Sequence, residues 1–282
     1  MSYGMSAGSF HGVALGHKAT RDFILSEYSY PGGASVPVHH HSWPYFCFVL
    51  EGAFTEQSGG QNRTCGPGTL IYHPLGEEHS EHFALRPARV FNIEIAPSRL
   101  EQLGESASRL RSGLTINGGL LVGLAMRLHS AFAERGAASI PAIEDIALQL
   151  FGETWFPVSD DPEQIPAWLK EAREMIRFGF RTNLTVLEIA KAISIHPVHL
   201  SRTFRKVYGR KVSEAILHYR IEYACRMLAS DNESLAFIAH DSGFADQSHF
   251  CREFKRIMGM TPGEYRNASR AMSFSPAPPR NE

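Results

Sequence analysis

The chain is poor in cysteine and has no long apolar run. Its cysteines number four among 282 residues, are widely spaced, and form no C-x-x-C pair; they are Cys47, Cys65, Cys225 and Cys251. This spacing, without a secretory signal at the start, argues against a zinc knuckle or a disulfide framework, so a reducing cytoplasm is the expected compartment. The longest apolar stretch, 118–126, falls short of the roughly 20 residues that span a bilayer, and no membrane role is expected.

The chain also lacks a strong net charge, but only when it is taken as a whole. The formal charge of all residues is -1. Up to Gln164 the chain holds 10 Lys and Arg against 17 Asp and Glu, a net -7, and beyond Gln164 it holds 18 against 12, a net +6. Because the footprint of a nucleic acid is local, the basic second half is the candidate for binding a polyanion.

The residue pattern changes along the chain from strand-like to helical. Runs such as 45–50 and 90–95 are β-branched or aromatic and are bounded by Gly or Pro, which predicts strands of a small barrel or sandwich. The following apolar residues have helical spacing, which is typical either of linker or dimerisation helices or of core helices of the first domain. The expected divisions are a strand-rich domain (1–100), linker helices (101–164), a helical domain (165–270) and a disordered tail (271–282).

The second half contains an internal repeat. Residues 187–213 match residues 236–263 at an offset of 49, which becomes 50 after a one-residue slip in the turn. Each copy predicts a short helix, a turn and a second helix that ends in basic residues, which is the layout of a helix-turn-helix unit. Asp246 is suited to cap the second of these helices in the second copy. A helix of about 18 residues between the copies, roughly 27 Å long, would let one chain reach two major grooves about 34 Å apart.

The segment 243–266 closely resembles the signature of the AraC/XylS family of transcription regulators, and the similarity extends from about Ile165 to Arg266. The resemblance implies a regulator, not an enzyme, that binds double-stranded DNA, with RNA polymerase as a candidate partner and a homodimer as the expected assembly. By position it assigns base contacts to Val198, Ser201, Arg202, Gln247, Ser248, Cys251 and Arg252. Basic residues farther along the two helices are expected to hold phosphates; these are Arg205, Lys206, Lys255 and Arg256.

Two positions of the first unit depart from the family's pattern. Ser194 stands at the turn, where Gly is frequent, and His196 stands where a Ser cap is frequent, followed by Pro197 at a first-turn position. The first recognition helix is therefore expected to be less well capped than the second, and its half-site is expected to be read more loosely.

Histidines of the first half resemble the two motifs of cupin domains. The first motif fits Gly33, His39 and His41, and the second fits Gly68, Pro74, Gly76 and His79. The cupin resemblance implies a β-barrel whose mouth brings these histidines together, although Tyr45 replaces the expected glutamate ligand. Three interpretations stay open: a divalent metal such as zinc or iron on His39, His41 and His79; a small-molecule pocket lined by these residues and Tyr45; or solvent-exposed histidines. Outside the cluster, surface or supporting positions are expected for His40, His73 and His82.

The sequence thus predicts an α+β protein of two domains, an N-terminal cupin-like β-barrel with linker helices and a C-terminal all-α domain with two helix-turn-helix units. The favoured function is a transcription regulator whose barrel senses a small molecule. Two rivals are a metal-dependent cupin enzyme fused to a DNA-binding domain, and a DNA-binding module whose inert barrel serves only for oligomerisation.

Overall fold

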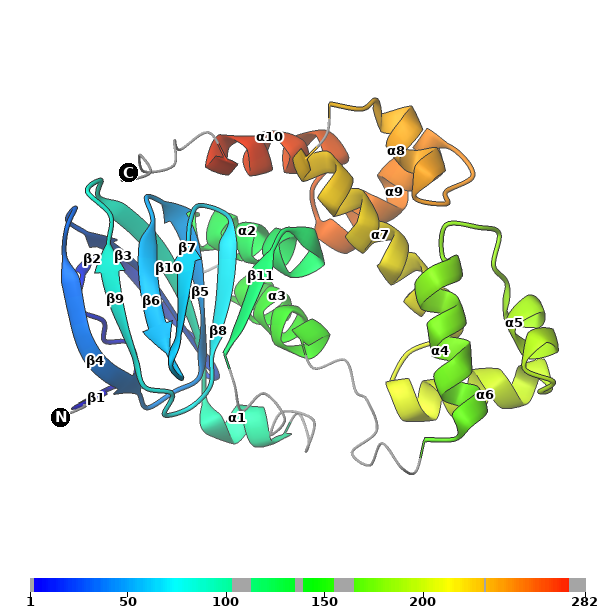
Figure 1. Cartoon of the computed structure of the whole chain (residues 1–282), viewed down its shortest axis with the longest axis horizontal. Helices are drawn as coiled ribbons and strands as arrows, with labels where there is room; N and C mark the ends of the chain where they lie inside the picture. Colours follow the sequence, from blue (N-terminus) through cyan, green and yellow to red (C-terminus); the bar gives the residue numbers. More distant parts are fainter. Residues whose placement is uncertain (1–2, 103–112, 135–138, 155–164, 231, 274–282) are drawn as a thin grey trace. The chain divides into compact units, whose positions relative to one another are not determined.

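The computed structural model of the chain describes residues 3–102, 113–134, 139–154, 165–230 and 232–273 (Figure 1). It contains two compact units, one built mainly from the chain up to Gly152 and the other from Glu153 to Arg266. The first is rich in β-strands and the second is helical, so the predicted α+β architecture is confirmed. None of the helices in the described part of the chain has the length and hydropathy of a bilayer-spanning segment. Most of the expected tail, from 274 onward, lies outside the described residues.

The first unit consists of two β-sheets that enclose an apolar core. The strands are β1 (Tyr3–Met5), β2 (Val13–Ala19), β3 (Phe23–Tyr30), β4 (Ser35–His41), β5 (Tyr45–Glu51), β6 (Phe54–Ser58), β7 (Gln61–Cys65), β8 (Thr69–His73), β9 (His79–Phe83), β10 (Ala88–Ile95) and β11 (Leu114–Asn117). One sheet has the order β1-β4-β9-β6-β7 and the other the order β11-β8-β5-β10-β3-β2. Phe54 and Phe83 of the first sheet pack in one cluster with Val49 and Ile71 of the second. The predicted strand runs 45–50 and 90–95 lie in β5 and β10.

Helices cover the outer face of the six-stranded sheet. These are α2 (Gly119–Ala133) and α3 (Ser139–Thr154), which follow β11, whereas α1 (Pro97–Gln102), between β10 and β11, has no buried residue. Phe46 of β5 lies 5.0 Å from Phe151 of α3, and Phe91 of β10 lies 5.1 Å from Phe132 of α2, measured between ring centroids. Central strands such as β5 are buried on both faces for this reason, since one face lines the barrel and the other carries helices. The apolar faces of α2 and α3 are thus used within the first unit, as core helices.

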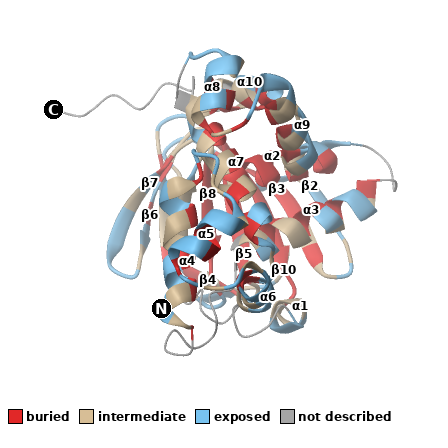
Figure 2. Cartoon of the chain, turned by 90° about the vertical axis from the view of Figure 1, so that its right-hand side faces the viewer, coloured by how far each residue is buried: buried red, intermediate tan, exposed pale blue. Residues whose placement is uncertain are grey.

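The second unit is helical throughout. Its helices are α4 (Ala167–Gly179), α5 (Val186–Ala192), α6 (Pro197–Tyr208), α7 (Val212–Ser230), α8 (Leu235–Asp241), α9 (Gln247–Met258) and the start of α10 (Pro262–Ser273), which continues past the end of this unit at Arg266. The predicted helix between the two repeats is α7, which is 19 residues long. The repeats bury matching faces: Leu200, Phe204 and Tyr208 of α6, and Phe250, Phe254 and Met258 of α9. In Figure 2 the helices of this unit carry both buried and exposed residues.

Candidate functional site

Helices α5 and α6 form the first helix-turn-helix unit, and side chains cap both of them. Glu188 N–H donates to Thr185 Oγ1 at 3.2 Å and Thr185 N–H donates to the Glu188 carboxylate at 2.8 Å, which is a complete capping box at the start of α5. At the start of α6, Val198 N–H donates to His196 Nδ1 at 3.3 Å, and Pro197 occupies the first turn. The imidazole of His196 therefore takes the place of the serine that the family pattern has here.

The turn of the first helix-turn-helix unit contains a backbone conformation that usually requires glycine. Ser194 has a φ of +55° and is the one non-glycine with positive φ among the described residues. An L-residue in this region is strained by about 1–2 kcal/mol, and the Ser194 side chain is exposed, so it meets no steric obstacle. The corresponding Gly243 has a φ of +83°, and a Cβ atom there would lie 2.8 Å from the carbonyl oxygens of Phe180 and Arg181. The two turns share a shape, but only the first has room for a side chain.

Helices α8 and α9 form the second unit, and both begin at capping side chains. Ser234 Oγ accepts from Phe237 N–H at 3.1 Å, and Asp246 Oδ1 accepts from His249 N–H at 2.7 Å. The predicted capping role of Asp246 is confirmed. A carboxylate in this position also interacts favourably with the positive end of the helix dipole.

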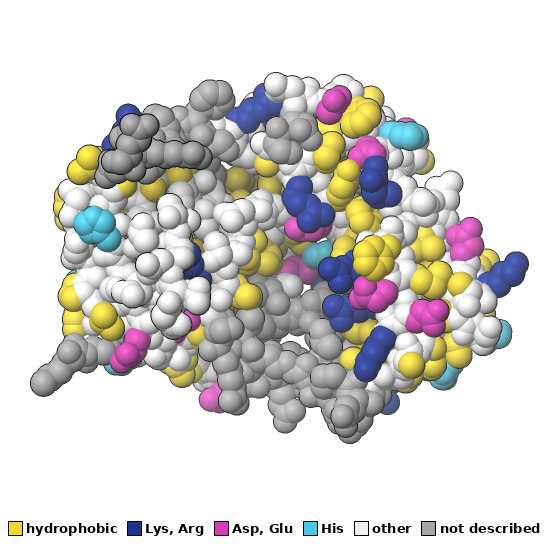
Figure 3. All heavy atoms as spheres, in the orientation of Figure 1, with side chains coloured by type: hydrophobic (Ala, Val, Ile, Leu, Met, Phe, Trp, Pro, Cys, Tyr) yellow, Lys and Arg dark blue, Asp and Glu magenta, His cyan; other side chains and the backbone are white. Residues whose placement is uncertain are grey.

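The structure places the predicted DNA-contact residues on the faces of α6 and α9 that are opposite the buried phenylalanines. On α6, Val198 is 59% exposed. Apart from half-buried Cys251, the remaining candidates are exposed; these are Ser201, Arg202, Arg205, Lys206, Gln247, Ser248, Arg252, Lys255 and Arg256. The space-filling view shows Lys and Arg side chains among the hydrophobic ones over the helical unit (Figure 3). Each recognition helix therefore presents a polar and basic face that its own core leaves free.

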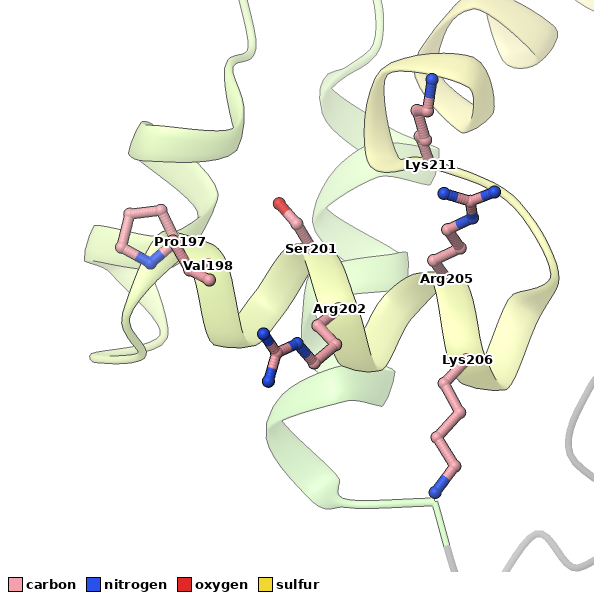
Figure 4. A pocket seen from close by; sticks show the side chains of 7 residues that line it. All are labelled: Pro197, Val198, Ser201, Arg202, Arg205, Lys206 and Lys211. Carbon is pink, nitrogen blue, oxygen red and sulfur yellow. The ribbon is translucent and has the colours of Figure 1, made fainter.

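The exposed face of α6 borders a hollow of about 670 Å³. Its lining consists of Pro197, Val198, Ser201, Arg202, Arg205, Lys206 and Lys211. In Figure 4 Arg205 and Lys211 extend on one side of α6, and Arg202 and Lys206 on the other. Sequence reasoning missed Lys211, because it lies outside the recognition helix, directly before α7. Aligning the two copies of the repeat would have singled out Lys211, because the second copy has the uncharged Thr261 at this position.

On α9 one predicted phosphate contact is already engaged by a carboxylate. Arg256 donates through Nη2 and Nε to Glu253 Oε2, at 2.6 Å and 3.0 Å. The residue of α6 that corresponds to Glu253 is the neutral Thr203. The second recognition face is consequently less positive than the first.

The end of α4 connects the two helix-turn-helix units. The Arg181 guanidinium forms an ion pair with Asp241 of α8, and Tyr223 of α7 donates its hydroxyl to the same carboxylate at 2.6 Å. Arg220 of α7 donates to the carbonyl oxygens of Phe180 and Thr182, at 2.8 Å each. These bonds join α4, α7 and α8 and so restrict how the two units move relative to each other.

Three histidines meet inside the β-barrel of the N-terminal unit. His39 and His41 come from β4 and His79 from β9, and His39 is paired with His79 in the strand register. Their exposed fractions are 2%, 3% and 1%, which rules out the interpretation that they are solvent-exposed. One nitrogen of each lies within 4.8 Å of the others. The predicted convergence of the cupin-motif histidines is therefore present.

Backbone carbonyl groups orient two of these rings. His39 Nδ1 lies 2.9 Å from the Pro37 carbonyl oxygen and His79 Nδ1 lies 3.0 Å from that of Glu77. Since a carbonyl oxygen can only accept, both Nδ1 atoms donate, and both Nε2 atoms keep their lone pairs. His39 Nε2 is 3.1 Å from His41 Nε2, close to the separation of two imidazole nitrogens that each lie about 2.0–2.1 Å from one zinc ion.

Burial keeps these imidazoles neutral. Desolvation is the main cause that lowers the pKa of His41, to about 2, and the neighbouring His39 lowers it further. Burial likewise lowers the pKa of His39 and of His79. Metal ligation requires neutral imidazole, so the protonation state fits a metal. Tyr45 places its hydroxyl 3.1 Å from His79 Nε2, where the family pattern would have a carboxylate.

A second polar layer adjoins the three histidines, and His73 lies in it, which is the supporting position that was one of the two alternatives expected for this residue. Its exposed fraction is 2%, and its ring stacks on Tyr45 at a centroid distance of 4.5 Å. It lies 3.8 Å from the fully buried Glu56 and 3.4 Å from Glu77. His73 is thus an interior residue, which its position on a strand buried on both faces explains. By contrast, His82 is exposed and His40 half-buried.

Sequence reasoning also missed the carboxylates of this layer. Glu56 pairs with Arg63 at 2.5 Å, and Glu81 lies opposite Glu56 in the register of β6 and β9. Burial, and then the negative charge of Glu56, raises the pKa of Glu81 to about 8. Glu56 and Glu81 each keep one oxygen without a hydrogen-bond partner. An interior with free hydrogen-bonding atoms fits a polar ligand better than an apolar one.

Two protein families match this chain. The Cupin domain matches residues 26–94 and the Helix-turn-helix domain matches residues 189–268. The HTH-type transcriptional regulator YijO of Escherichia coli is 26% identical over 236 residues, which are 79% of this chain and 81% of that one. An AraC-like transcription regulator of Streptomyces antibioticus is 31% identical over 113 residues, 37% of each chain.

Among solved structures, the C-terminal domain of AraT, a response regulator from Geobacillus stearothermophilus, is similar to part of this chain. It is 28% identical, covers 37% of this chain and 87% of that one, and has a TM-score of 0.36. The two domain matches and the relatives agree with the helix-turn-helix units and the barrel described above. The chain therefore contains a cupin domain followed by an AraC-type helix-turn-helix domain, and the relatives that it matches are named HTH-type or AraC-like transcription regulators.

Proposed function

We propose that α6 and α9 enter successive major grooves of promoter DNA and that their exposed faces read its sequence. Supporting this is the matched exposure of both helices opposite their buried phenylalanines. The base-reading residues are Val198, Ser201 and Arg202 of α6, and Gln247, Ser248, Cys251 and Arg252 of α9. Arginine can pair bidentately with guanine, glutamine with adenine, and valine can contact a thymine methyl group. The phosphate contacts are Arg205, Lys206, Lys255 and Arg256, which position the helices without reading sequence.

Arg252 and Lys255 provide a matched test of this division of labour. On the preferred site of the protein, Arg252→Ala is expected to cost about 1–3 kcal/mol of binding free energy, and on scrambled DNA much less. Lys255→Ala is expected to weaken both complexes by a similar factor and to reduce the salt dependence. Fluorescence anisotropy with both duplexes measures these losses. Equal losses for Arg252→Ala on the two duplexes would contradict a base-reading role.

We also propose that the barrel is a sensor built around His39, His41 and His79, which would hold a divalent metal ion such as zinc or iron. Three neutral imidazoles, of which His39 and His79 have an unprotonated Nε2, form a donor set that suits both metals. Such an ion would act as a Lewis acid toward a small molecule with oxygen donors. Tyr45 adjoins this position, and its hydroxyl would donate a hydrogen bond to that molecule. Effector binding regulates transcription only if the effector prefers one arrangement of the protein over another.

Elemental analysis tests the metal directly. Protein purified without chelator is expected to contain about one metal ion per chain, and His39→Ala/His41→Ala/His79→Ala is expected to contain none. The surface variant His82→Ala is the matched control and should keep the metal. Absence of stoichiometric metal from the unaltered protein would rule out both the metal-based sensor and a metal-dependent cupin enzyme. A sensor further requires that the metal or an effector changes DNA affinity, whereas an inert barrel predicts no change.

A cytoplasmic homodimer that contacts RNA polymerase is part of the same proposal. Supporting self-association is β2, an edge strand of the six-stranded sheet on which Val13 and Leu15 are 65% and 53% exposed. Exposed apolar residues on an edge strand favour pairing with another chain. Sedimentation of the full chain measures the assembly state.

A further inference from the structure

We propose that Lys211 is an additional phosphate contact, and that the first helix-turn-helix unit lacks a helix cap at this position because it carries this cation. The proposal deepens the proposed insertion of α6 into DNA and rests on it. The first helix-turn-helix unit would then supply most of the sequence-independent attraction between the domain and DNA.

Lys211 and Thr261 occupy the same structural position in the two units. Ala215 N–H donates to the Lys211 carbonyl oxygen at 3.0 Å, and Tyr265 N–H donates to that of Thr261 at 3.0 Å. Both residues therefore stand at the cap position of the helix that follows the recognition helix, α7 in the first unit and α10 in the second.

The two positions differ in how they cap the helix. Thr261 forms a complete capping box, because Glu264 N–H donates to its Oγ1 at 3.2 Å and its own N–H donates to the Glu264 carboxylate at 2.6 Å. Lys211 keeps only half of this arrangement, the bond from its N–H to Glu214 Oε2 at 2.8 Å. A lysine side chain has no acceptor atom, so it cannot cap the free N–H groups of α7.

The side chain of Lys211 is exposed beside the recognition helix α6 instead of capping α7. Its side chain is 62% exposed and lines the hollow on α6 together with Arg205 and Lys206. In Figure 4 it extends on the same side of α6 as Arg205. Glu214 Oε1 lies 3.7 Å from Lys211 Nζ, but both side chains are exposed, and such a pair is weak and readily exchanged for a phosphate.

The charges of the two recognition faces differ accordingly. The first has Arg202, Arg205, Lys206 and Lys211 against Glu214, a net +3. The second has Arg252, Lys255 and Arg256 against Glu253 and Glu264, a net +1. Because release of counterions by phosphate contacts supplies the affinity for any duplex, the first unit is expected to dominate binding that is independent of sequence.

Exchanging the two residues tests the proposal in the full chain. The variants are Lys211→Thr, Thr261→Lys and Lys211→Gln, and the probe is a random-sequence duplex of about 20 base pairs, long enough for two half-sites one turn apart. Anisotropy titrations at several salt concentrations are expected to show a salt slope that is smaller by about 0.9 for Lys211→Thr and Lys211→Gln. Thr261→Lys is expected to increase the slope. Melting curves should show that Lys211→Thr unfolds at a higher temperature and Thr261→Lys at a lower one.

Unchanged salt slopes for Lys211→Thr and Lys211→Gln, with the unaltered protein binding the duplex, would overturn the contact at Lys211 alone. A lower melting temperature for Lys211→Thr would overturn the argument that the position lacks a cap. Failure of the unaltered protein to bind any duplex would instead contradict the proposed function.

Discussion

Gly243→Ser is expected to destabilise the second helix-turn-helix unit by about 3 kcal/mol, by far the larger effect of the two possible exchanges between the turns. Two costs add at this position. The φ of +83° strains any L-residue, and the new Cβ would lie 2.8 Å from the carbonyl oxygens of Phe180 and Arg181, which cannot move without disturbing the end of α4. The end of α4 also connects the two helix-turn-helix units. We therefore expect Gly243→Ser to lose DNA binding together with stability.

Ser194→Gly is the matched exchange in the first turn. It removes strain at a φ of +55° without changing any contact, so it is expected to stabilise the unit by up to about 1 kcal/mol, less the greater entropy of glycine in the unfolded chain. Chemical denaturation followed by circular dichroism measures both variants. If Gly243→Ser were as stable as the unaltered protein, the described geometry of the second turn would be wrong.

Arg63→Met is expected to destabilise the barrel by about 3–5 kcal/mol. The guanidinium lies 2.5 Å from the carboxylate of Glu56, whose side chain is fully buried, and its Nη1 donates to Thr115 Oγ1 at 3.2 Å. Removing the cation leaves a carboxylate in the interior without a partner for its charge. The large cost comes from that isolated charge and not from the attraction lost.

Two controls separate this cause from a loss of packing. Glu56→Leu/Arg63→Met removes both charges and should recover most of the lost stability, since a buried ion pair is roughly neutral relative to apolar residues of similar volume. Arg99→Ala removes a surface ion pair, in which Arg99 Nε lies 3.5 Å from Asp22 Oδ2 and both side chains are about 30% exposed. This variant should lose less than about 1 kcal/mol of stability. Thermal melting compares the three variants. A double variant no more stable than Arg63→Met would assign the effect to packing.

The features that could be predicted from the sequence are those that depend on spacing. The repeat fixed the positions of α6 and α9 and the length of α7, because the periodicity of a helix makes its buried face visible in one dimension. The strand runs followed from local patterns in the same way, whereas the convergence of His39, His41 and His79 was implied by the resemblance to the cupin motifs. Asp246 was identifiable as a cap because capping depends on neighbours three residues away.

The features that could not be predicted depend on contacts that the spacing of residue types does not reveal. His73 is an interior residue because β8 is covered on both faces, and that covering comes from elements far along the chain. The pairing of Glu56 with Arg63 across a hairpin is likewise invisible in composition. Lys211 stands outside the recognition helix in sequence, and only the turn between α6 and α7 brings it to the hollow on α6. The role of His196 as a cap required the geometry of its ring.

Selection of binding sites from a random duplex library by the full chain tests the central claim most directly. Two recognition helices separated by α7 predict an enriched motif with two half-sites about one helical turn, 10–10.5 base pairs, apart. Arg252→Ala should lose the base preference of one half-site and Arg202→Ala that of the other. Enrichment of no motif, or of a motif that both variants leave unchanged, would contradict the account of α6 and α9 as the readers of DNA sequence.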